Sequence, residues 1–115
     1  MIAKRFRFHG YGSLKFVYGK GKTVRARFLS MKFVANTRRQ ESRLAVVVSK
    51  KISKRAPERN RIRRRVYEAF RAHWEEILPG TDMVITVFDE RVRTLPSSEL
   101  QGSVRELLIS AKLLK

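Results

Sequence analysis

Cysteine is absent from the 115 residues of this chain, and histidine occurs only at His9 and His73. The chain can therefore form no disulfide and no thiolate-ligated metal site. The lack of cysteine is compatible with a reducing cytoplasm, where we expect the protein to act. No apolar run approaches the roughly 18 residues that a membrane-spanning helix needs. Residues 1–8 are basic and lack the apolar stretch of a secretory signal peptide.

Acidic residues are also scarce. The chain has 27 lysines and arginines against 10 aspartates and glutamates, and its formal net charge is +17. Residues 1–65 hold 21 of these cations against two acids, whereas residues 66–115 carry a net charge of −2. Such a concentration of positive charge predicts a polyanionic partner. A hydrophobic content of 43% argues against disorder and favours one folded domain over residues 1–115.

The stretch from Lys50 to Trp74 concentrates the charge. Nine of its first sixteen residues are lysine or arginine, and only Glu58 opposes them. Pro57 suits the first turn of a helix, where a missing N–H costs nothing. Apolar residues then recur at three- and four-residue steps, as on one face of an amphipathic helix: Ile62, Val66, Ala69, Phe70, His73 and Ile77. Asn60, Arg63, Arg64, Tyr67 and Arg71 share a neighbouring arc, and Arg61 and Arg65 lie on the far flank.

A charge run can also be an ordinary solvated helix face. That alternative would be favoured by acidic residues interleaved as i,i+4 partners, and the stretch from Lys50 to Arg65 lacks such interleaving. Arginine predominates from Arg55 onward, and its planar guanidinium suits phosphate better than the point charge of lysine does. The pattern therefore predicts a helix that binds nucleic acid.

Three segments have the character of strands, and a further short strand stays open. In the segment from Thr23 to Val34, apolar residues alternate with polar ones, but the alternation changes phase at Leu29. This change suggests a bulge, or a strand that leaves one surface for another. The segments from Arg43 to Ser49 and from Met83 to Phe88 are continuously apolar, as expected of strands covered on both faces.

Two more helices complete the predicted fold. The charged helix described above is expected to end near Pro79-Gly80. Of the two further helices, a short one runs from Ser13 to Tyr18. The last begins at Pro96-Ser97 and turns inward Leu100, Val104, Leu107, Leu108 and Ala111. The order of elements predicts the α+β class, a single small domain with a roughly four-stranded sheet, three helices and the helices on one side of the sheet.

Residues 1–11 mix cations with aromatics, and two interpretations stay open. Phe6 and Phe8 either stack on bases while neighbouring cations hold phosphates, or pin the terminus to the core. Whether this segment is ordered also stays open. The Gly-Lys-Gly-Lys sequence at residues 19–22 lacks the spacing of a phosphate-binding nucleotide loop.

Catalytic machinery is not visible in the sequence. His73 lies on the apolar arc of the charged helix, which favours a structural role, and His9 is best explained as a surface or packing residue. The pairs Glu75-Glu76 and Asp89-Glu90 are adjacent in sequence and therefore point in different directions. Ser97 and Ser98 are better explained as the start of a helix than as nucleophiles. We expect no catalytic residue and no metal ligands in the protein itself.

The basic stretch and the strand before it closely resemble the bacterial ribonuclease P protein component. The resemblance is carried by Val46-Val47-Val48-Ser49-Lys50-Lys51, then by Arg59-Asn60-Arg61 and further basic residues at helical spacing. Strand, basic loop and helix thus occur in one order. A looser resemblance covers the whole chain, in its length, its aromatic and basic N-terminal segment, its order of elements and its apolar C-terminal helix.

The resemblance implies one α+β domain with a left-handed βαβ crossover, against the usual right-handed rule. It also implies that the protein is a subunit of the endoribonuclease that removes the 5′ leader from precursor tRNA. The RNA subunit would carry out this cleavage with Mg²⁺, bound mainly by the RNA and the substrate, and no organic cofactor is expected. The implied partners are the ribonuclease P RNA and precursor tRNA, with no membrane and no obligate protein partner.

Carried over residue by residue, the resemblance implies two sets of contacts. The set for the catalytic RNA is Lys51, Lys54, Arg55, Arg59, Asn60, Arg61, Arg63, Arg64 and Arg65. The set for the leader, in a cleft between the first helix and the sheet face, is Leu14, Val17, Tyr18, Arg27, Phe28 and Met31. Leu14 stands where many members of the family have Phe, and Met31 stands where some have Tyr. Stacking on the leader is therefore expected to be weaker, or partly replaced by dispersion contact with methionine.

Three other functions compete with this one. A plain RNA-binding or ribosomal protein would share the composition, but the sequence around Arg59-Asn60-Arg61 argues against it. A stand-alone nuclease would need a cluster of carboxylates, and none is visible. A DNA-binding regulator would need side chains that read base edges, and a helix so crowded with arginine has no obvious set of them.

Overall fold

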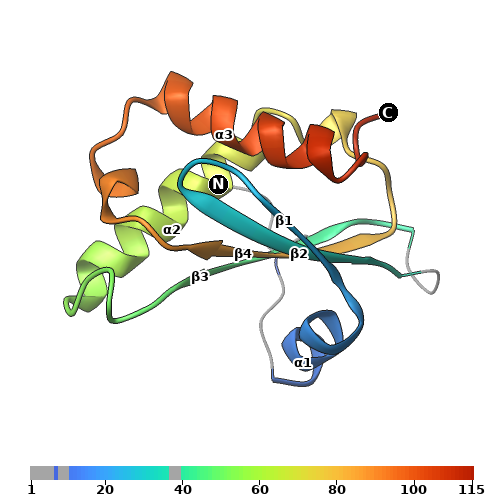
Figure 1. Cartoon of the computed structure of the whole chain (residues 1–115), viewed down its shortest axis with the longest axis horizontal. Helices are drawn as coiled ribbons and strands as arrows, with labels where there is room; N and C mark the ends of the chain where they lie inside the picture. The colour runs from blue at the N-terminus through green and yellow to red at the C-terminus, as the bar shows by residue number, and fades with distance from the viewer. Residues whose placement is uncertain (1–6, 8–10, 37–39) are drawn as a thin grey trace.

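The computed structural model describes residues 7, 11–36 and 40–115, so the predictions for Phe6, Phe8 and His9 lie outside the described residues. The elements along the chain are α1 (Tyr11–Lys20), β1 (Lys22–Arg25), β2 (Leu29–Ala35), β3 (Arg43–Val48), α2 (Ala56–Arg71), the short 3₁₀ helix η2 (Trp74–Glu76), β4 (Thr81–Val87), the 3₁₀ helix η3 (Glu90–Arg93) and α3 (Ser97–Ser110). Figure 1 shows their arrangement around one sheet.

The four strands lie in the order β1-β2-β4-β3. β1 pairs with β2 and β2 with β4 in antiparallel fashion, whereas β3 and β4 are parallel neighbours. The chain passes from β3 through α2 to β4, which makes the predicted βαβ unit. The left-handed sense of this crossover stays an expectation from the resemblance. The predicted α+β class, with three helices and a four-stranded sheet in a single small domain, is confirmed.

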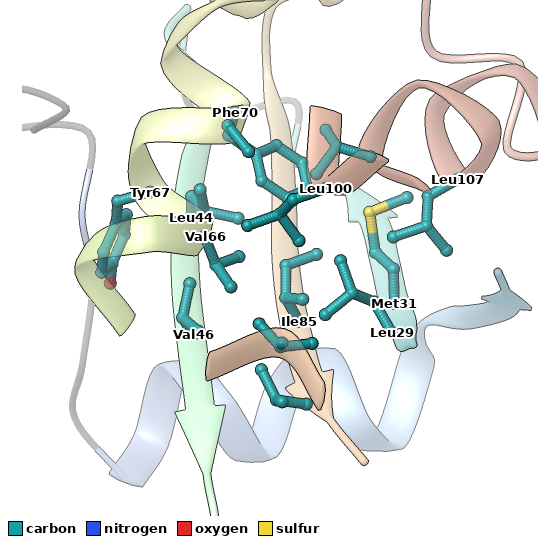
Figure 2. Packing of buried hydrophobic residues seen from close by; sticks show 14 of the residues in the cluster. Leu29, Met31, Leu44, Val46, Val66, Tyr67, Phe70, Ile85, Leu100 and Leu107 are labelled. Atoms are coloured by element: carbon teal, nitrogen blue, oxygen red, sulfur yellow. The ribbon is translucent and has the colours of Figure 1, made fainter. Parts of the chain in front are cut away.

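The main core lies between the sheet and the pair α2 and α3. Side chains alternate between the faces of a strand, so Leu29 and Met31 of β2 point to the same side of the sheet. They belong to one buried cluster with Phe70 of α2 and Leu107 of α3, and all four are fully buried (Figure 2). Burial of each such side chain stabilises the fold by about 1.5–3 kcal/mol. The apolar faces predicted for α2 and α3 are therefore the faces that pack.

The first helix covers the opposite face of the sheet, so the prediction that all helices lie on one side is wrong (Figure 1). Val17 of α1 is fully buried against Ala45 of β3 and Val84 of β4. The continuous apolar character of β3 and β4 follows from this, because both faces of these strands are covered. Gly21 ends α1 where its backbone meets β2, and a Cβ atom there would lie 2.5 Å from the carbonyl oxygen of Val17.

The segment from Thr23 to Val34 is a hairpin, not the single long strand that the alternation predicted. Val24 of β1 lies opposite Met31 of β2, and the Ala26 N–H donates to the Leu29 carbonyl oxygen at 2.9 Å. The phase change at Leu29 therefore marks a reversal of the chain. It was misread because residues 26–28 contain no glycine, proline, asparagine or aspartate, the usual signals of a turn.

The end of the sheet near the start of β3 and β4 is fixed by a buried carboxylate. Asp82, 1% exposed, accepts two hydrogen bonds from the Arg43 guanidinium, at 3.0 and 2.8 Å, and one from the Asn36 amide at 2.9 Å. Such a bidentate pair is geometrically specific. These three residues come from β3, β4 and the end of β2, so the cluster fixes three strands relative to one another.

The second helix is shorter than predicted. It ends at Arg71, and the chain continues through η2 to Ile77 before the turn at Gly80, whose φ is 77°. The His73 N–H donates to the Phe70 carbonyl oxygen at 3.0 Å, which tightens the last turn. Within the described ranges, no helix is both long and apolar enough to cross a membrane.

Candidate nucleic-acid interface

The loop before α2 is held against the helix by one acidic residue. Glu58, in the first turn of α2, accepts a hydrogen bond from the Ser53 hydroxyl at 2.7 Å and one from the Arg93 guanidinium at 3.3 Å. The Ser53 hydrogen bond is the main reason why the pKa of the Glu58 carboxyl lies below its usual value. The negative charge also suits the helix N-terminus, where unpaired N–H groups point outward. The one acid among nine cations thus stabilises the start of the helix.

Six of the nine residues predicted to bind RNA have exposed side chains, and they occupy the loop and the outer arc of α2. These six are Lys51, Lys54, Arg55, Asn60, Arg61 and Arg64. The buried side of the same helix holds Ile62, Val66 and Phe70 in the core. In the part of the chain that the structure describes, the side chains of Arg61 and Arg64 form no hydrogen bond or ion pair. The helix is therefore anchored by one side and presents charge on the other, as predicted.

Two of the remaining three are half-buried but stay at the surface. The Arg59 guanidinium donates to the Ser53 carbonyl oxygen at 2.9 Å, so it also fastens the loop to the helix. The Arg63 guanidinium donates to the side-chain oxygen of Asn60 within the same helix. Both could still direct further N–H groups toward phosphate, since a guanidinium has five donors.

Arg65 also has a structural role that the sequence did not predict, and its contact with RNA stays a prediction. Its guanidinium is half-buried and donates to the backbone carbonyl oxygens of Val92 and Leu95, which follow β4. These hydrogen bonds tie the segment around η3 to α2. Helical spacing placed Arg65 at the flank of the charged arc, but the sequence could not reveal that two carbonyl groups lie there.

Tyr67 is also misplaced by the sequence, which assigned it to the charged arc. Its side chain is only 8% exposed and lies beside β3, near Val46 (Figure 2). Burial raises the pKa of the Tyr67 phenol, while a hydrogen bond with the Val46 backbone and the positive charges of Arg7 and Arg63 oppose the rise. The Arg7 guanidinium lies 5.9 Å from the centre of the Tyr67 ring. Arg7 also forms a parallel bridge with Leu44 of β3, the last strand of the sheet.

The opposite face of the sheet carries the second predicted site. Tyr18 of α1 is 43% exposed, and the Lys32 ammonium lies 5.6 Å from the centre of its ring and donates to the Tyr18 carbonyl oxygen at 3.1 Å. Leu14 is half-buried against the same small cluster as Val17. Arg27 is exposed at the β1–β2 turn, with its guanidinium 5.3 Å from the centre of the Phe28 ring. Tyr18 and Arg27 are thus accessible.

Met31 is placed on the wrong face by the prediction. It is fully buried in the main core under α3, on the side of the sheet away from α1 (Figure 2). Val17 is also fully buried, and Phe28 is 3% exposed, so neither offers a side-chain surface to a ligand. Alternation along a strand assigns residues to two faces, but it does not tell which face the first helix covers.

Sequence reasoning missed three further residues on the α1 side of the sheet, Arg25, Lys32 and Phe88. The Arg25 guanidinium lies 4.9 Å from the centre of the Phe88 ring, which is 42% exposed. Arg25 and Lys32 alternate with core residues along β1 and β2, and this alternation was the signal that could have found them. We call Tyr18, Arg25, Lys32 and Phe88 the α1-side cluster. It combines exposed aromatic rings with cations, the combination typical of surfaces that bind single-stranded nucleic acid.

Acid–base groups do not converge in the described part of the chain, where no three histidine or acidic side chains form a group suited to a metal ion. His73 is largely buried, with Nδ1 3.9 Å from a Glu76 carboxylate oxygen and Nε2 without a hydrogen-bond partner. This placement confirms the expected position of His73 on the packed side of the helix.

Comparison with known proteins identifies the family. The family described as Ribonuclease P matches residues 2–112. The ribonuclease P protein component of a Pseudanabaena species is 35% identical over 99 residues, covering 85% of this chain and 84% of the relative. That of Staphylococcus haemolyticus is 30% identical over 111 residues, covering 96% and 94%. The RNase P protein structure from Staphylococcus aureus superposes with a TM-score of 0.83 at 26% identity, covering 96% of this chain and 98% of that one. The chain therefore belongs to the ribonuclease P protein family, whose members are protein components of the ribonucleoprotein endoribonuclease that processes tRNA.

Proposed function

We propose that the chain binds the catalytic RNA of ribonuclease P through residues 49–55 and α2, and the 5′ leader of precursor tRNA through the α1 side of the sheet. The observation that carries this proposal is the outer arc of α2. This arc presents Arg61 and Arg64 to solvent. The acidic residue in the first turn of α2, Glu58, is already engaged by Ser53 and Arg93. Guanidinium groups in this arrangement are suited to the phosphates of RNA.

The α1 side of the sheet supports the assignment of the leader. The leader is single-stranded, so its bases can stack on exposed rings while its phosphates meet cations. The α1-side cluster offers both, through Tyr18 and Phe88 and through Arg25 and Lys32. Of the residues first predicted for the leader, Tyr18 and Arg27 keep that role in the proposal, with Leu14 at the margin. Val17, Phe28 and Met31 instead support the fold beneath.

Cleavage itself is assigned to the RNA. The Mg²⁺ that the reaction needs would be bound mainly by the RNA and the substrate, because the surfaces that the protein presents to them are cationic and repel metal ions. Two long polyanions also repel each other, and a protein with a net charge of +17 between them reduces that repulsion. The protein would therefore lower the Mg²⁺ concentration that the RNA needs and favour precursor over mature tRNA.

The proposal requires no protein partner and no organic cofactor. It places the complex in the cytoplasm, because its substrate, precursor tRNA, is made there in bacteria. Both partners of the protein would be RNA: the leader would lie on the α1 side of the sheet and the catalytic RNA along α2, with Leu14 where the two surfaces meet.

The test is multiple-turnover cleavage of precursor tRNA by a bacterial ribonuclease P RNA at low Mg²⁺, with and without the protein. The proposal predicts a higher rate and tighter binding of precursor than of mature tRNA when the protein is present. No gain in rate or in precursor affinity would reject the role. The protein alone should show no cleavage, and cleavage without RNA would reject the assignment of the chemistry.

A further inference from the structure

The second helix lies between two grooves. One, the β3-side groove, has a volume of about 800 Å³ and is lined by Arg7, Leu14, residues 45–48 of β3 and, from α2, Pro57, Asn60, Arg63, Arg64 and Tyr67. The other, the α3-side groove, has a volume of about 570 Å³ and is lined from α2 by Arg61, Arg64, Arg65, Glu68, Ala69, Arg71 and Ala72, and from α3 by Ser97, Leu100 and Gln101. α2 therefore forms a ridge with a hollow along each flank.

Arg64 belongs to both grooves. At about 100° per residue, Arg61 and Arg63 lie roughly 160° apart around the helix axis, and Arg64 falls between them. Arg63 thus faces the β3-side groove, Arg61 faces the α3-side groove, and Arg64 stands at the crest of the ridge.

Both grooves are positively charged. The lining of the β3-side groove includes three arginines and no acidic residue. In the α3-side groove, Glu68 pairs with Arg71 at 2.9 Å, and the Arg65 guanidinium binds backbone carbonyls. Arg61 and Arg64 remain there with exposed side chains. A single polyanionic strand along one groove would leave the cations of the other unmatched.

The grooves also lack the rings on which single strands stack. Proteins that bind single-stranded nucleic acid place bases on exposed aromatic side chains. The α3-side groove is lined by no aromatic residue, and Tyr67 in the β3-side groove is only 8% exposed. This surface is instead suited to the phosphate backbone of a folded RNA, which proteins recognise by its shape and its phosphates.

We propose that two backbone segments of one folded RNA lie along the two grooves, with α2 between them and Arg64 in contact with both. This inference rests on the proposed function and adds how the RNA is held. A helix with its side chains is about 10–12 Å across, so two segments separated by that width would meet the two flanks together. The wide, shallow minor groove of an RNA helix presents two such backbones.

The experiment is hydroxyl-radical footprinting of a bacterial ribonuclease P RNA at saturating protein concentrations. The variants Arg61→Ala, Arg63→Ala and Arg64→Ala each remove one positive charge from α2. Alanine is the best helix former, so the helix should persist in all three. The matched control is Arg105→Ala, which removes one charge from an exposed position on α3, where Arg105 pairs with Glu76 at 3.3 Å.

The wild-type protein should protect two separate backbone segments. Arg61→Ala should re-expose one of them, Arg63→Ala the other, and Arg64→Ala both in part, while Arg105→Ala leaves the pattern unchanged. Each α2 variant should weaken binding about fivefold near 0.15 M salt, the contribution of one phosphate contact.

Two results would overturn the inference while the proposed function stands. The first is that Arg61→Ala and Arg63→Ala re-expose the same segment, and the second is that Arg61→Ala keeps every protection; either result means that RNA occupies one flank only. A wild-type protein that protects no part of the RNA would reject the proposed function itself, and this inference with it.

Discussion

The guanidinium of Arg65 donates a hydrogen bond to the backbone carbonyl oxygen of Leu95, thirty residues further along the chain. Arg64, its neighbour in sequence, is exposed, whereas Arg65 is half-buried. Two adjacent arginines of one helix thus have different tasks. Arg65 fastens the segment after β4 to α2, and Arg64 is left to meet a partner.

This difference predicts effects of different size on the free energy of unfolding. Arg65→Ala should lower the free energy of unfolding by about 1–3 kcal/mol, because two carbonyl groups lose a charged donor. Arg64→Ala should change it by less than about 0.5 kcal/mol, as is usual at an exposed surface position. Urea denaturation followed by circular dichroism measures both. Equal effects of the two substitutions would contradict the assignment of Arg65.

The buried carboxylate of Asp82 should be among the most sensitive positions of the fold. Asp82→Ala leaves the Arg43 guanidinium, whose side chain is 13% exposed, without its bidentate partner. Breaking such a pair costs about 3–5 kcal/mol, because the largely buried guanidinium loses two charge-assisted hydrogen bonds. The comparison is Arg105→Ala, which breaks a pair with both side chains about half exposed and should cost at most about 1 kcal/mol. A thermal or urea transition for Asp82→Ala close to that of Arg105→Ala would refute this account of the sheet end.

The hydrogen bond from Ser53 to Glu58 predicts a pH dependence. The pKa of the Glu58 carboxyl is lowered in the folded protein from its ordinary value of 4.5, chiefly by Ser53. A lowered pKa stabilises the fold above pH 4.5, and this contribution is lost as the pH falls through the folded-state value. Ser53→Ala should therefore destabilise the protein at neutral pH and converge toward the wild type in acid.

The measurement is the free energy of unfolding of both proteins between pH 3 and pH 7, a range that brackets 4.5, the ordinary pKa of the Glu58 carboxyl. The control repeats the comparison in the Glu58→Gln background. There, the difference in free energy of unfolding between the proteins with and without Ser53→Ala should not shrink as the pH falls. A difference between Ser53→Ala and the wild type that stays constant over the whole range would show that the hydroxyl acts without Glu58.

Much of the fold could be predicted because its helices and buried strands follow strong periodicities. The apolar row from Ile62 to Phe70 faces the core as expected, and so does the row that begins at Leu100. The side of the sheet that α1 covers could not be predicted, since it depends on the path of the chain. The hairpin was missed because its turn at Arg27 carries none of the usual turn residues.

The site was predicted unevenly for the same reason. Local helical geometry suffices to expose Arg61 and Arg64 on α2. It cannot show that distant segments approach the same helix, as Leu95 approaches Arg65 and β3 approaches Tyr67. Alternation along β2 assigns Lys32 to the face opposite Met31, but only the path of the chain shows that α1 lies on that face, where the Lys32 ammonium donates to the Tyr18 carbonyl oxygen.

Tyr18 and Met31 were first assigned to one leader-binding cleft but lie on opposite faces of the sheet. Their substitutions should therefore have different effects, one on tRNA binding and the other on stability. Tyr18→Ala should weaken binding of precursor tRNA by about fivefold or more, the effect of losing one base stack, while binding of mature tRNA and assembly with the RNA stay unchanged. Met31→Ala should instead lower the free energy of unfolding by about 2–5 kcal/mol, because it opens a cavity in the core.

Both effects are measured by tRNA binding to the assembled holoenzyme and by urea denaturation of the protein. Equal losses of precursor and mature tRNA binding in Tyr18→Ala would contradict the role of the α1-side cluster. A loss of precursor binding in Met31→Ala without any loss of stability would contradict its placement in the core.

The most direct test of the central claim is the affinity of the protein for a bacterial ribonuclease P RNA over a series of salt concentrations, for the wild type and for Arg64→Ala. If α2 holds phosphates, the logarithm of the affinity should fall steeply with the logarithm of the salt concentration, and Arg64→Ala should reduce the slope by about one. A shallow slope for the wild type, or the same slope and affinity for both proteins, would contradict the claim that this helix binds the RNA.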